Sequence, residues 1–258
     1  QLILSIQDLA QTLDASGQVD CILLDLSKAF DKVPHKRLLL KAHHYGIDGR
    51  LHSWIASFLR DRSQQVALEG TTSAPAPVTS GVPQGTVLGP LLFLIFINDM
   101  PTKVSSTPRL FADDCLLYRQ IRSDQDQRLL QQDLDSLQKW EEDWLMQFNP
   151  DKCEVLRVTN KRAPLVCDYT IHGQKLQSTD AAKYLGLNIQ SNLKWNTHID
   201  SVCKRANSTI AFLQRNIKRC PTNIKAQCYI QLVRPAAEYA SSVWSPPTKA
   251  GINKIEAI

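Results

Sequence analysis

The sequence predicts an α+β protein, in which an antiparallel sheet backed by helices is followed by a mostly helical segment. Short apolar runs bounded by turn residues recur up to residue 190, and such runs are typical of buried strands. Apolar residues at helical spacing separate these runs and dominate from residue 195 onward. With 258 residues, 43% of them hydrophobic, the chain can form one large domain or two small ones around a core.

The first predicted elements lead to a carboxylate at the end of a buried strand. Apolar residues recur at helical spacing over 2–13, and Ser16-Gly17 ends that pattern. The run 19–26 is apolar almost throughout, which predicts a strand buried on both faces with Asp25 at its end. We then expect two short amphipathic helices at 36–44 and 51–59 and two extended pieces at 64–68 and 76–79. A Gly- and Pro-rich loop at 80–85 follows and leads into an apolar helix at 87–98.

A hairpin and a long helix are expected next. Residues 109–112 and 115–118 are apolar arms around Asp113-Asp114, which predicts a β-hairpin with two carboxylates at its tip. The long helix has an acidic outer face and is marked by Leu130, Leu134, Leu137, Trp144 and Phe148. After a break at 149–151, strand-like pieces are expected at 154–158, 165–171 and 182–189.

The helix that begins near Trp195 has two opposite faces. Apolar residues from Trp195 to Ile217 fall along one line. The opposite side carries five basic residues, Lys204, Arg205, Arg215, Lys218 and Arg219. A solvated face is the ordinary explanation, and a surface that meets phosphate groups is the alternative. Charge favours the alternative, since residues 1–150 hold 14 Lys and Arg against 18 Asp and Glu, whereas residues 151–258 hold 16 against 7.

Several classes of protein and site are excluded. The longest apolar run, 91–97, is far shorter than the roughly 20 residues that a membrane-spanning helix needs. Residues 1–11 lack the basic start of a leader, so we expect an intracellular protein, nuclear or cytoplasmic, that is not secreted. The seven cysteines include no C-x-x-C pair and are expected to be reduced and structural. The histidines lack metal-ligand spacing, which makes a zinc site unexpected.

Three carboxylates point to a cation site. If the strand that ends at Asp25 neighbours the Asp113-Asp114 hairpin, the three side chains meet at one edge of the sheet. Magnesium binds carboxylate and phosphate oxygens, and two such ions can stabilise both the attacking and the leaving oxygen of a phosphoryl transfer. The ordinary alternative is that Asp113-Asp114 is only a turn and Asp25 only a cap.

Longer motifs around these carboxylates favour the cation site over a turn and a cap. The blocks 23–33 (LLDLSKAFDKV), 80–90 (SGVPQGTVLGP) and 111–114 (FADD), in this order and spacing, resemble the reverse transcriptases of non-LTR retrotransposons, and the jockey-like group in particular. The similarity continues through 149–153, 184–186, Tyr239-Ala240 and Trp244, and so covers nearly the whole chain.

The resemblance implies a right-hand polymerase palm with a metal-binding triad of Asp25, Asp113 and Asp114. Two Mg²⁺ ions are implied as cofactors, with Mn²⁺ as a substitute. Phe30 matches the position whose ring blocks a ribose 2′-OH, although it is also expected as an ordinary core residue. The backbone of Leu26, Ser27, Lys28 and Ala29 would lie near the incoming triphosphate.

Other matched positions imply contacts with nucleic acid and with the leaving group. Gln84 and Gly85 match a loop that touches the template nucleotide and the incoming base, unless the loop is only a helix entry. Lys152 falls near the family position of a lysine proposed to protonate the pyrophosphate leaving group. The alternative is that Lys152 is an ordinary surface lysine. Tyr184, Leu185 and Gly186 match the hairpin that grips the primer end, and the basic helix matches the thumb.

The family also carries fingers motifs before its first aspartate. Only 24 residues precede Asp25, none of them Lys or Arg, and the chain does not begin with Met. We therefore expect a fragment with a palm and a remnant of the fingers over 1–190 and a partial helical thumb over 191–258, without the endonuclease domain of the same polyprotein.

The expected activity is that of an RNA-directed DNA polymerase module, which adds deoxynucleotides to a primer 3′-OH. Its partners would be an RNA template, a DNA primer and deoxynucleoside triphosphates, with no membrane. Intact Asp25, Asp113 and Asp114 favour this activity. The missing fingers favour the alternative, a truncated or domesticated copy that folds or binds nucleic acid without catalysis. A nuclease is disfavoured because the 83–85 loop and the Tyr184 hairpin have no evident place in one.

Overall fold

The computed structural model describes all residues from 1 to 258, which form two compact units. The first, here called the carboxylate unit, comprises 20–155 and 165–177. The second, the helical unit, comprises 1–19, 156–164 and 178–258.

The carboxylate unit contains most of a five-stranded sheet with the strand order β11-β8-β1-β7-β6. Its strands are β1 (Gln18–Asp25), β6 (Thr107–Phe111), β7 (Asp114–Gln120), β8 (Glu154–Thr159) and β11 (Gln177–Thr179), of which β1, β8 and β11 continue into the helical unit. Its helices are α2 (Ala29–Lys32), α3 (His35–His44), α4 (Gly49–Leu59), α5 (Leu88–Ile97), the short 3₁₀ helix η1 (Met100–Lys103) and α6 (Asp124–Trp144).

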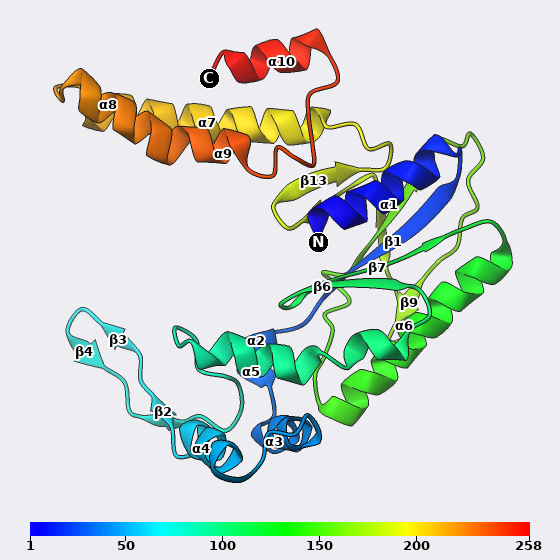
Figure 1. Cartoon of the computed structure of the whole chain (residues 1–258), viewed down its shortest axis with the longest axis vertical. Helices are drawn as coiled ribbons and strands as arrows, with labels where there is room; N and C mark the ends of the chain where they lie inside the picture. Colours follow the sequence, from blue (N-terminus) through cyan, green and yellow to red (C-terminus); the bar gives the residue numbers. More distant parts are fainter. The chain divides into compact units, whose positions relative to one another are not determined.

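A continuous apolar core joins the sheet to these helices. Ile22 of β1 and Leu117 of β7 are fully buried, together with Phe93 of α5 and Leu134 of α6. In Figure 1, α6 runs along the strands. Aromatic rings of α5 and α6 pack against each other. Because both faces of β1 and β7 are covered, their sequences are apolar almost throughout rather than alternating.

Local sequence fixes the ends of α6. Ser123 and Asp126 form a capping box at its first turn. The Ser123 hydroxyl accepts from the backbone N–H of Asp126, and the Asp126 carboxylate accepts from the backbone N–H of Ser123. The Asp126 carboxylate also accepts from the backbone N–H of Arg122. The hydrogen bonds from Arg122 and from Ser123 lower the pKa of Asp126. The helix ends at Leu145, which takes a left-handed conformation with φ 55°.

Small two-stranded ladders complete the carboxylate unit. They are β2 (Ser63–Gln64) with β5 (Ala76–Pro77), β3 (Ala67–Leu68) with β4 (Thr71–Thr72), and β9 (Thr170–Ile171) with β10 (Gln174–Lys175), all antiparallel. The first two ladders are exposed along their whole length, as the cyan arm of Figure 1 shows.

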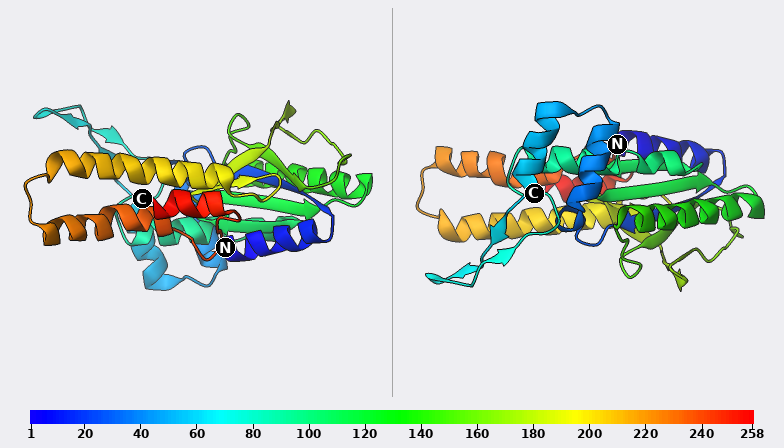
Figure 2. Two further views of the ribbon diagram at one scale, coloured as in Figure 1. Left: turned by 90° about the horizontal axis from the view of Figure 1, so that it is seen from above. Right: turned by 90° about the horizontal axis from the view of Figure 1, so that it is seen from below.

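The helical unit has a much smaller core. It contains α1 (Leu2–Asp14), the hairpin β12 (Ala181–Tyr184) and β13 (Leu187–Gln190), α7 (Asn196–Asn216), α8 (Thr222–Cys228), the π-helical turn η2 (Tyr229–Val233), α9 (Arg234–Glu238) and α10 (Lys249–Glu256). Both views of Figure 2 show α7 beside α8 and α9. Ala206, Leu213 and Val233 form the buried cluster between them.

The main predicted elements are confirmed, and three details are wrong. Residues 165–169 form no strand, and only 170–171 do. The expected strand at 182–189 is a hairpin, because Leu185 and Gly186 have φ of 44° and 83° and turn the chain. Phe148 lies beyond the end of α6 and pairs with Leu26. The acidic outer face of α6 is confirmed at Asp124, Asp135, Glu142 and Asp143, whereas Asp133 and Glu141 of the same helix are buried.

None of the helices is both long enough and apolar enough to cross a bilayer.

Candidate active site

Two neighbouring strands bring the predicted carboxylates to one edge of the sheet. Asp25 is the last residue of β1, and Asp114 is the first residue of the adjacent strand β7. Phe111 and Asp114 are paired, so that Ala112 and Asp113 form the two-residue turn of the hairpin β6-β7. Ala112 adopts φ 52°, which is uncommon for a residue other than glycine. The predicted hairpin with carboxylates at its tip is thereby confirmed.

The charges of these carboxylates act on one another. Partial burial raises the pKa of Asp114, and the neighbouring charges of Asp113 and Asp25 raise it further. The three groups therefore form a site of net negative charge, which attracts cations. Asp25 is half-buried, with 41% of its side chain exposed, and stays accessible to a ligand.

Lys152 lies beside this site. Its Nζ is 3.5 Å from Oδ2 of Asp25, and its side chain is 65% exposed. Backbone pairing brings it there, because Ser27 N–H donates to Gln147 O at 2.8 Å and Asn149 N–H donates to Asp25 O at 2.8 Å. A turn at 149–153 then returns the chain to β8.

Glu141 of α6 supports the pairing between 25–27 and 147–149. The sequence did not single out this residue. Its Oε1 accepts from the backbone N–H of Phe148, and its Oε2 lies 3.0 Å from Nε2 of His172. Burial raises the pKa of the Glu141 carboxyl. The residue fixes the chain between α6 and the segment that pairs with Asp25. Its position on a helix with several acidic residues gave no signal that it turns inward.

The donor set fits a divalent cation such as Mg²⁺. It consists of carboxylate oxygens, which are the ligands that this ion prefers. In their present conformations, no three His, Cys, Asp or Glu side chains converge closely enough to chelate one ion. Asp25, Asp113 and Asp114 are nonetheless the residues that would hold it, since the repulsion among them is relieved by added positive charge.

The segment after β1 is tightly shaped. Lys28 takes φ 51° and is exposed, and it precedes the one-turn helix α2. Leu26 and Ala29 are buried, so only the backbone and the side chains of Ser27 and Lys28 reach the surface. Lys32 Nζ donates to Ser27 Oγ at 3.1 Å.

Phe30 packs as a core residue and remains half-buried. Its ring stacks on that of Phe93 with centroids 4.4 Å apart and an interplanar angle of 23°. This stacking fixes the orientation of the Phe30 ring close to the segment that carries Asp25. The core-packing interpretation of Phe30 is therefore correct, and it leaves a further role for the exposed part of the ring open to test.

The Gly- and Pro-rich loop 80–85 is tied to α2. Val82 N–H donates to Phe30 O and Gly81 N–H to Val33 O, both at 2.8 Å. Gly81 has φ 88°, and a Cβ there would lie 2.7 Å from the carbonyl oxygen of Asp31. Gln84 and Gly85 are exposed at the end of this loop.

A polar cleft of about 620 Å³ opens beside the loop. It is lined by Lys28 and Asp31 from the segment after β1, by Arg62 and Gln64, and by Gln84. The sequence motifs at 23–33 and 80–90 thus line one continuous surface.

In the helical unit, the predicted primer-grip residues form the β12-β13 turn. Tyr184 is buried at the end of β12, and Leu185 and Gly186 make the turn itself. Tyr239 covers this turn: its hydroxyl donates to Leu185 O at 3.0 Å, and a Cβ on Gly186 would lie 3.1 Å from its ring. Trp244 Nε1 in turn donates to Tyr239 O at 2.8 Å.

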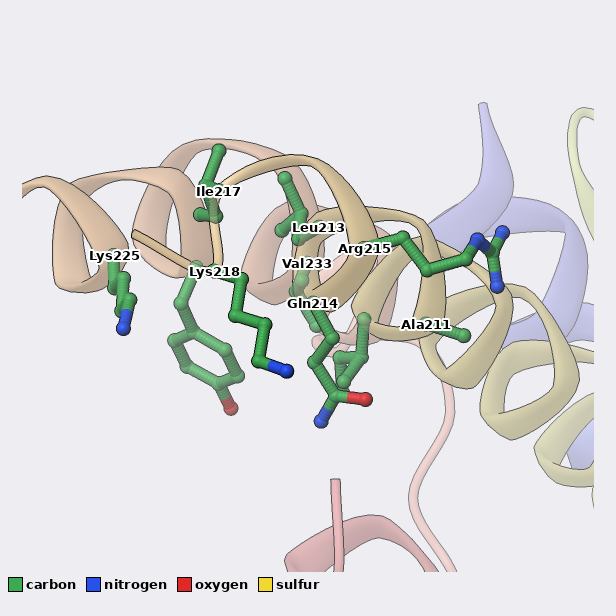
Figure 3. Close-up of a pocket in the computed structure, with 10 residues that line it drawn as sticks. Ala211, Leu213, Gln214, Arg215, Ile217, Lys218, Lys225 and Val233 are labelled. Atoms are coloured by element: carbon green, nitrogen blue, oxygen red, sulfur yellow. The ribbon is translucent and has the colours of Figure 1, made fainter. Parts of the chain in front are cut away.

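The basic residues of α7 and of the turn that follows it are all exposed, as predicted. Arg215 and Lys218 also line a groove of about 680 Å³ between α7 and η2, whose floor includes Leu213 and Val233. Figure 3 shows Lys218 and Lys225 extending toward one side of the helices, while Arg215 extends in another direction. Lys225 belongs to α8, so both helices contribute positive charge around this groove.

Comparisons with known proteins agree with this arrangement. Residues 3–189 match the family described as reverse transcriptase (RNA-dependent DNA polymerase). The chain is 29% identical over 247 residues to the RNA-directed DNA polymerase from mobile element jockey of Drosophila melanogaster, which covers 91% of the chain and 27% of that protein. The corresponding protein of Drosophila funebris is 30% identical over 262 residues, covering 96% and 28%. The chain therefore spans less than a third of these curated relatives.

Solved structures support the fold. Telomerase from Candida tropicalis superposes with a TM-score of 0.52 at 13% identity, covering 76% of this chain and 35% of that one. Telomerase from Candida albicans, solved with a TWJ fragment of telomeric RNA, gives the same score at 11% identity and covers 99% of this chain and 50% of that one. The α+β prediction and the right-hand polymerase architecture are confirmed.

Proposed function

The chain belongs to the reverse transcriptase family, and from this premise we propose that it is the RNA-directed DNA polymerase module of a non-LTR retrotransposon. It adds deoxynucleotides to the 3′-OH of a DNA primer on an RNA template. The observation that carries the proposal is the placement of Asp25 and Asp114 at the ends of adjacent strands, where their charges interact.

Asp25, Asp113 and Asp114 hold the metal ions in this proposal. Two bound Mg²⁺ ions, or Mn²⁺ in their place, supply charge stabilisation to the attacking and leaving oxygens. Lys152, whose Nζ lies 3.5 Å from Asp25, donates a proton to the pyrophosphate leaving group. The segment 26–29 lies against the incoming triphosphate, and its backbone N–H groups other than that of Ser27, which donates to Gln147 O, bind phosphate oxygens.

Neighbouring residues select the substrate. The ring of Phe30 excludes a ribose 2′-OH, and its stacking on Phe93 keeps it in place. Gln84 and Gly85 contact the template nucleotide and the incoming base.

The remaining sites bind the primer and the duplex. Tyr184, Leu185 and Gly186 grip the primer end, and Lys204, Arg205, Arg215, Lys218 and Arg219 contact the duplex backbone. Residues 1–190 then serve as a palm with a remnant of the fingers, and 191–258 as a partial thumb. Fingers and endonuclease segments of a longer polyprotein are further partners.

Primer extension on an RNA template with Mg²⁺ tests the proposal. We expect Asp113→Asn to reduce extension by more than about a hundredfold, since even outer-shell partners of metals are worth 10- to 100-fold. Binding of the primer-template should stay intact, because one negative charge near a polyanion is removed.

Asp143→Asn, on an exposed position of α6, is the matched control and should keep full activity. Extension by Asp113→Asn at the wild-type rate would refute the active-site assignment. Tight primer-template binding by a wild-type chain that never extends a primer would instead favour a non-catalytic, nucleic-acid-binding copy.

A further inference from the structure

Asp31 connects the two loops of the candidate site. It follows Phe30 in α2, and its Oδ1 accepts a hydrogen bond of 3.1 Å from the side-chain Nε2 of Gln84. A glutamine amide has a donor end and an acceptor end, whereas a carboxylate only accepts. The contact therefore holds the NH₂ end of Gln84 toward Asp31 and leaves its Oε1 facing away.

The backbone of Asp31 is itself fixed. Ser80 Oγ donates to Asp31 O at 2.9 Å, and the neighbouring Phe30 O accepts from Val82 N–H at 2.8 Å. Gly81 approaches so closely that a Cβ would lie 2.8 Å from Cα of Asp31. The carboxylate thus stands on a rigid base, while the side chain of Gln84 is exposed and would otherwise rotate freely.

We propose that Asp31 is a positioning residue for nucleotide selection, which orients the Gln84 amide so that Oε1 faces the base pair being formed. The inference rests on the proposed role of Gln84 and adds a residue to it. An asparagine at 31 has nearly the same size but carries both a donor and an acceptor, so either end of the Gln84 amide can pair with it. Orientation, rather than space, is what Asp31→Asn removes.

Discrimination between templated and mismatched deoxynucleotides tests this role. We expect Asp31→Asn to lower the ratio of the two kcat/KM values by about tenfold, the effect of replacing one charge-assisted hydrogen bond by a neutral one that either end of the Gln84 amide can form. In a Gln84→Ala background the same substitution should have no further effect, because Asp31 acts only through Gln84. Asp135→Asn is the matched control, since it makes the same change to a similar bond of 2.8 Å from Gln131 Nε2 on α6.

Two results would overturn the inference: unchanged discrimination in Asp31→Asn, or an equal loss in both backgrounds. A measurement without catalysis separates this from failure of the proposed function. The side-chain amide signals of Gln84 in a ¹⁵N spectrum, identified by their disappearance in Gln84→Ala, should shift and exchange faster in Asp31→Ala. If the wild type extends no primer, the proposed function fails, and unchanged Gln84 signals in Asp31→Ala would refute the positioning role independently.

Discussion

The two units of the molecule fix their functional residues in different ways. In the carboxylate unit, Asp25, Phe30 and the 80–85 loop are held by backbone hydrogen bonds and by a large buried core. In the helical unit, the basic residues of α7 are exposed on a helix whose other side is buried at Ile199, Val202 and Ala206. Chemistry at a fixed point requires the first arrangement. Binding of a long, uniform polyanion requires only an exposed charged surface, which the second provides.

Salt dependence of primer-template binding should show the largest difference between the units. Replacing Lys204, Arg205, Arg215, Lys218 and Arg219 together by Gln should flatten the slope of log affinity against log salt by up to about 0.9 for each phosphate that the protein no longer neutralises. Filter binding or fluorescence anisotropy at several salt concentrations measures it. Helical content should stay nearly unchanged, since the apolar residues of α7 are untouched. A wild-type slope in the variant would leave α7 as a solvated surface only.

Truncations in the core should lower the free energy of unfolding more in the carboxylate unit than in the helical unit. Leu134→Ala in the fully buried core of the carboxylate unit should lower the free energy of unfolding by about 3 to 5 kcal/mol. Leu213→Ala should cost only about 2 kcal/mol, because that residue borders an open groove. Urea unfolding measures both, with the exposed Leu232→Ala as a control near zero. Equal costs for the two buried leucines would contradict the described contrast between the cores.

The smallest expected effect concerns Lys41, which is buried among aromatic rings. Its Nζ lies 3.7 Å from the centroid of the Trp144 ring and pairs with Asp99, and burial lowers its pKa to about 8. In the unfolded chain a lysine titrates near 10.4. Between these values the unfolded state binds more protons than the native state, so Lys41 makes stability rise with pH from about 8 to 10.

Melting temperatures at pH 7.5 and 9.5 test this contribution. Lys41→Met should remove that part of the rise, whereas Lys204→Met, at an exposed position of the helical unit, should leave the pH profile as it is. A wild-type pH profile in Lys41→Met would show that Lys41 keeps an ordinary pKa in the native state.

Patterns along the chain were sufficient for the strand that ends at Asp25 and for the hairpin with Asp113 at its turn. Both depend on local apolar runs and turn residues, which are visible in sequence. The hairpin at 181–190 was harder to predict, because its turn uses Leu185 with positive φ, held by Tyr239 from far along the chain. Tertiary contacts, not local preference, decide that turn.

The supporting contacts of the site were not predictable in the same way. Lys152 reaches Asp25 through pairing between 25–27 and 147–149, which are more than a hundred residues apart. Glu141 turns inward, where its carboxylate accepts from Phe148 N–H and faces Nε2 of His172. Such contacts depend on which segments the fold brings together, and a single sequence carries no periodic signal for them.

The cysteines differ in burial, which allows the two units to be labelled selectively. Cys115 and Cys153 lie in the core beneath the carboxylates, and burial raises their pKa values to about 12 and about 11. They therefore remain protonated and resist alkylation. Cys167 of the carboxylate unit and Cys220 of the helical unit are only half-buried. A maleimide dye pair at these two positions, with Cys203 and Cys228 changed to serine, would report by energy transfer how the units move as nucleic acid binds, without altering any residue of the carboxylate site.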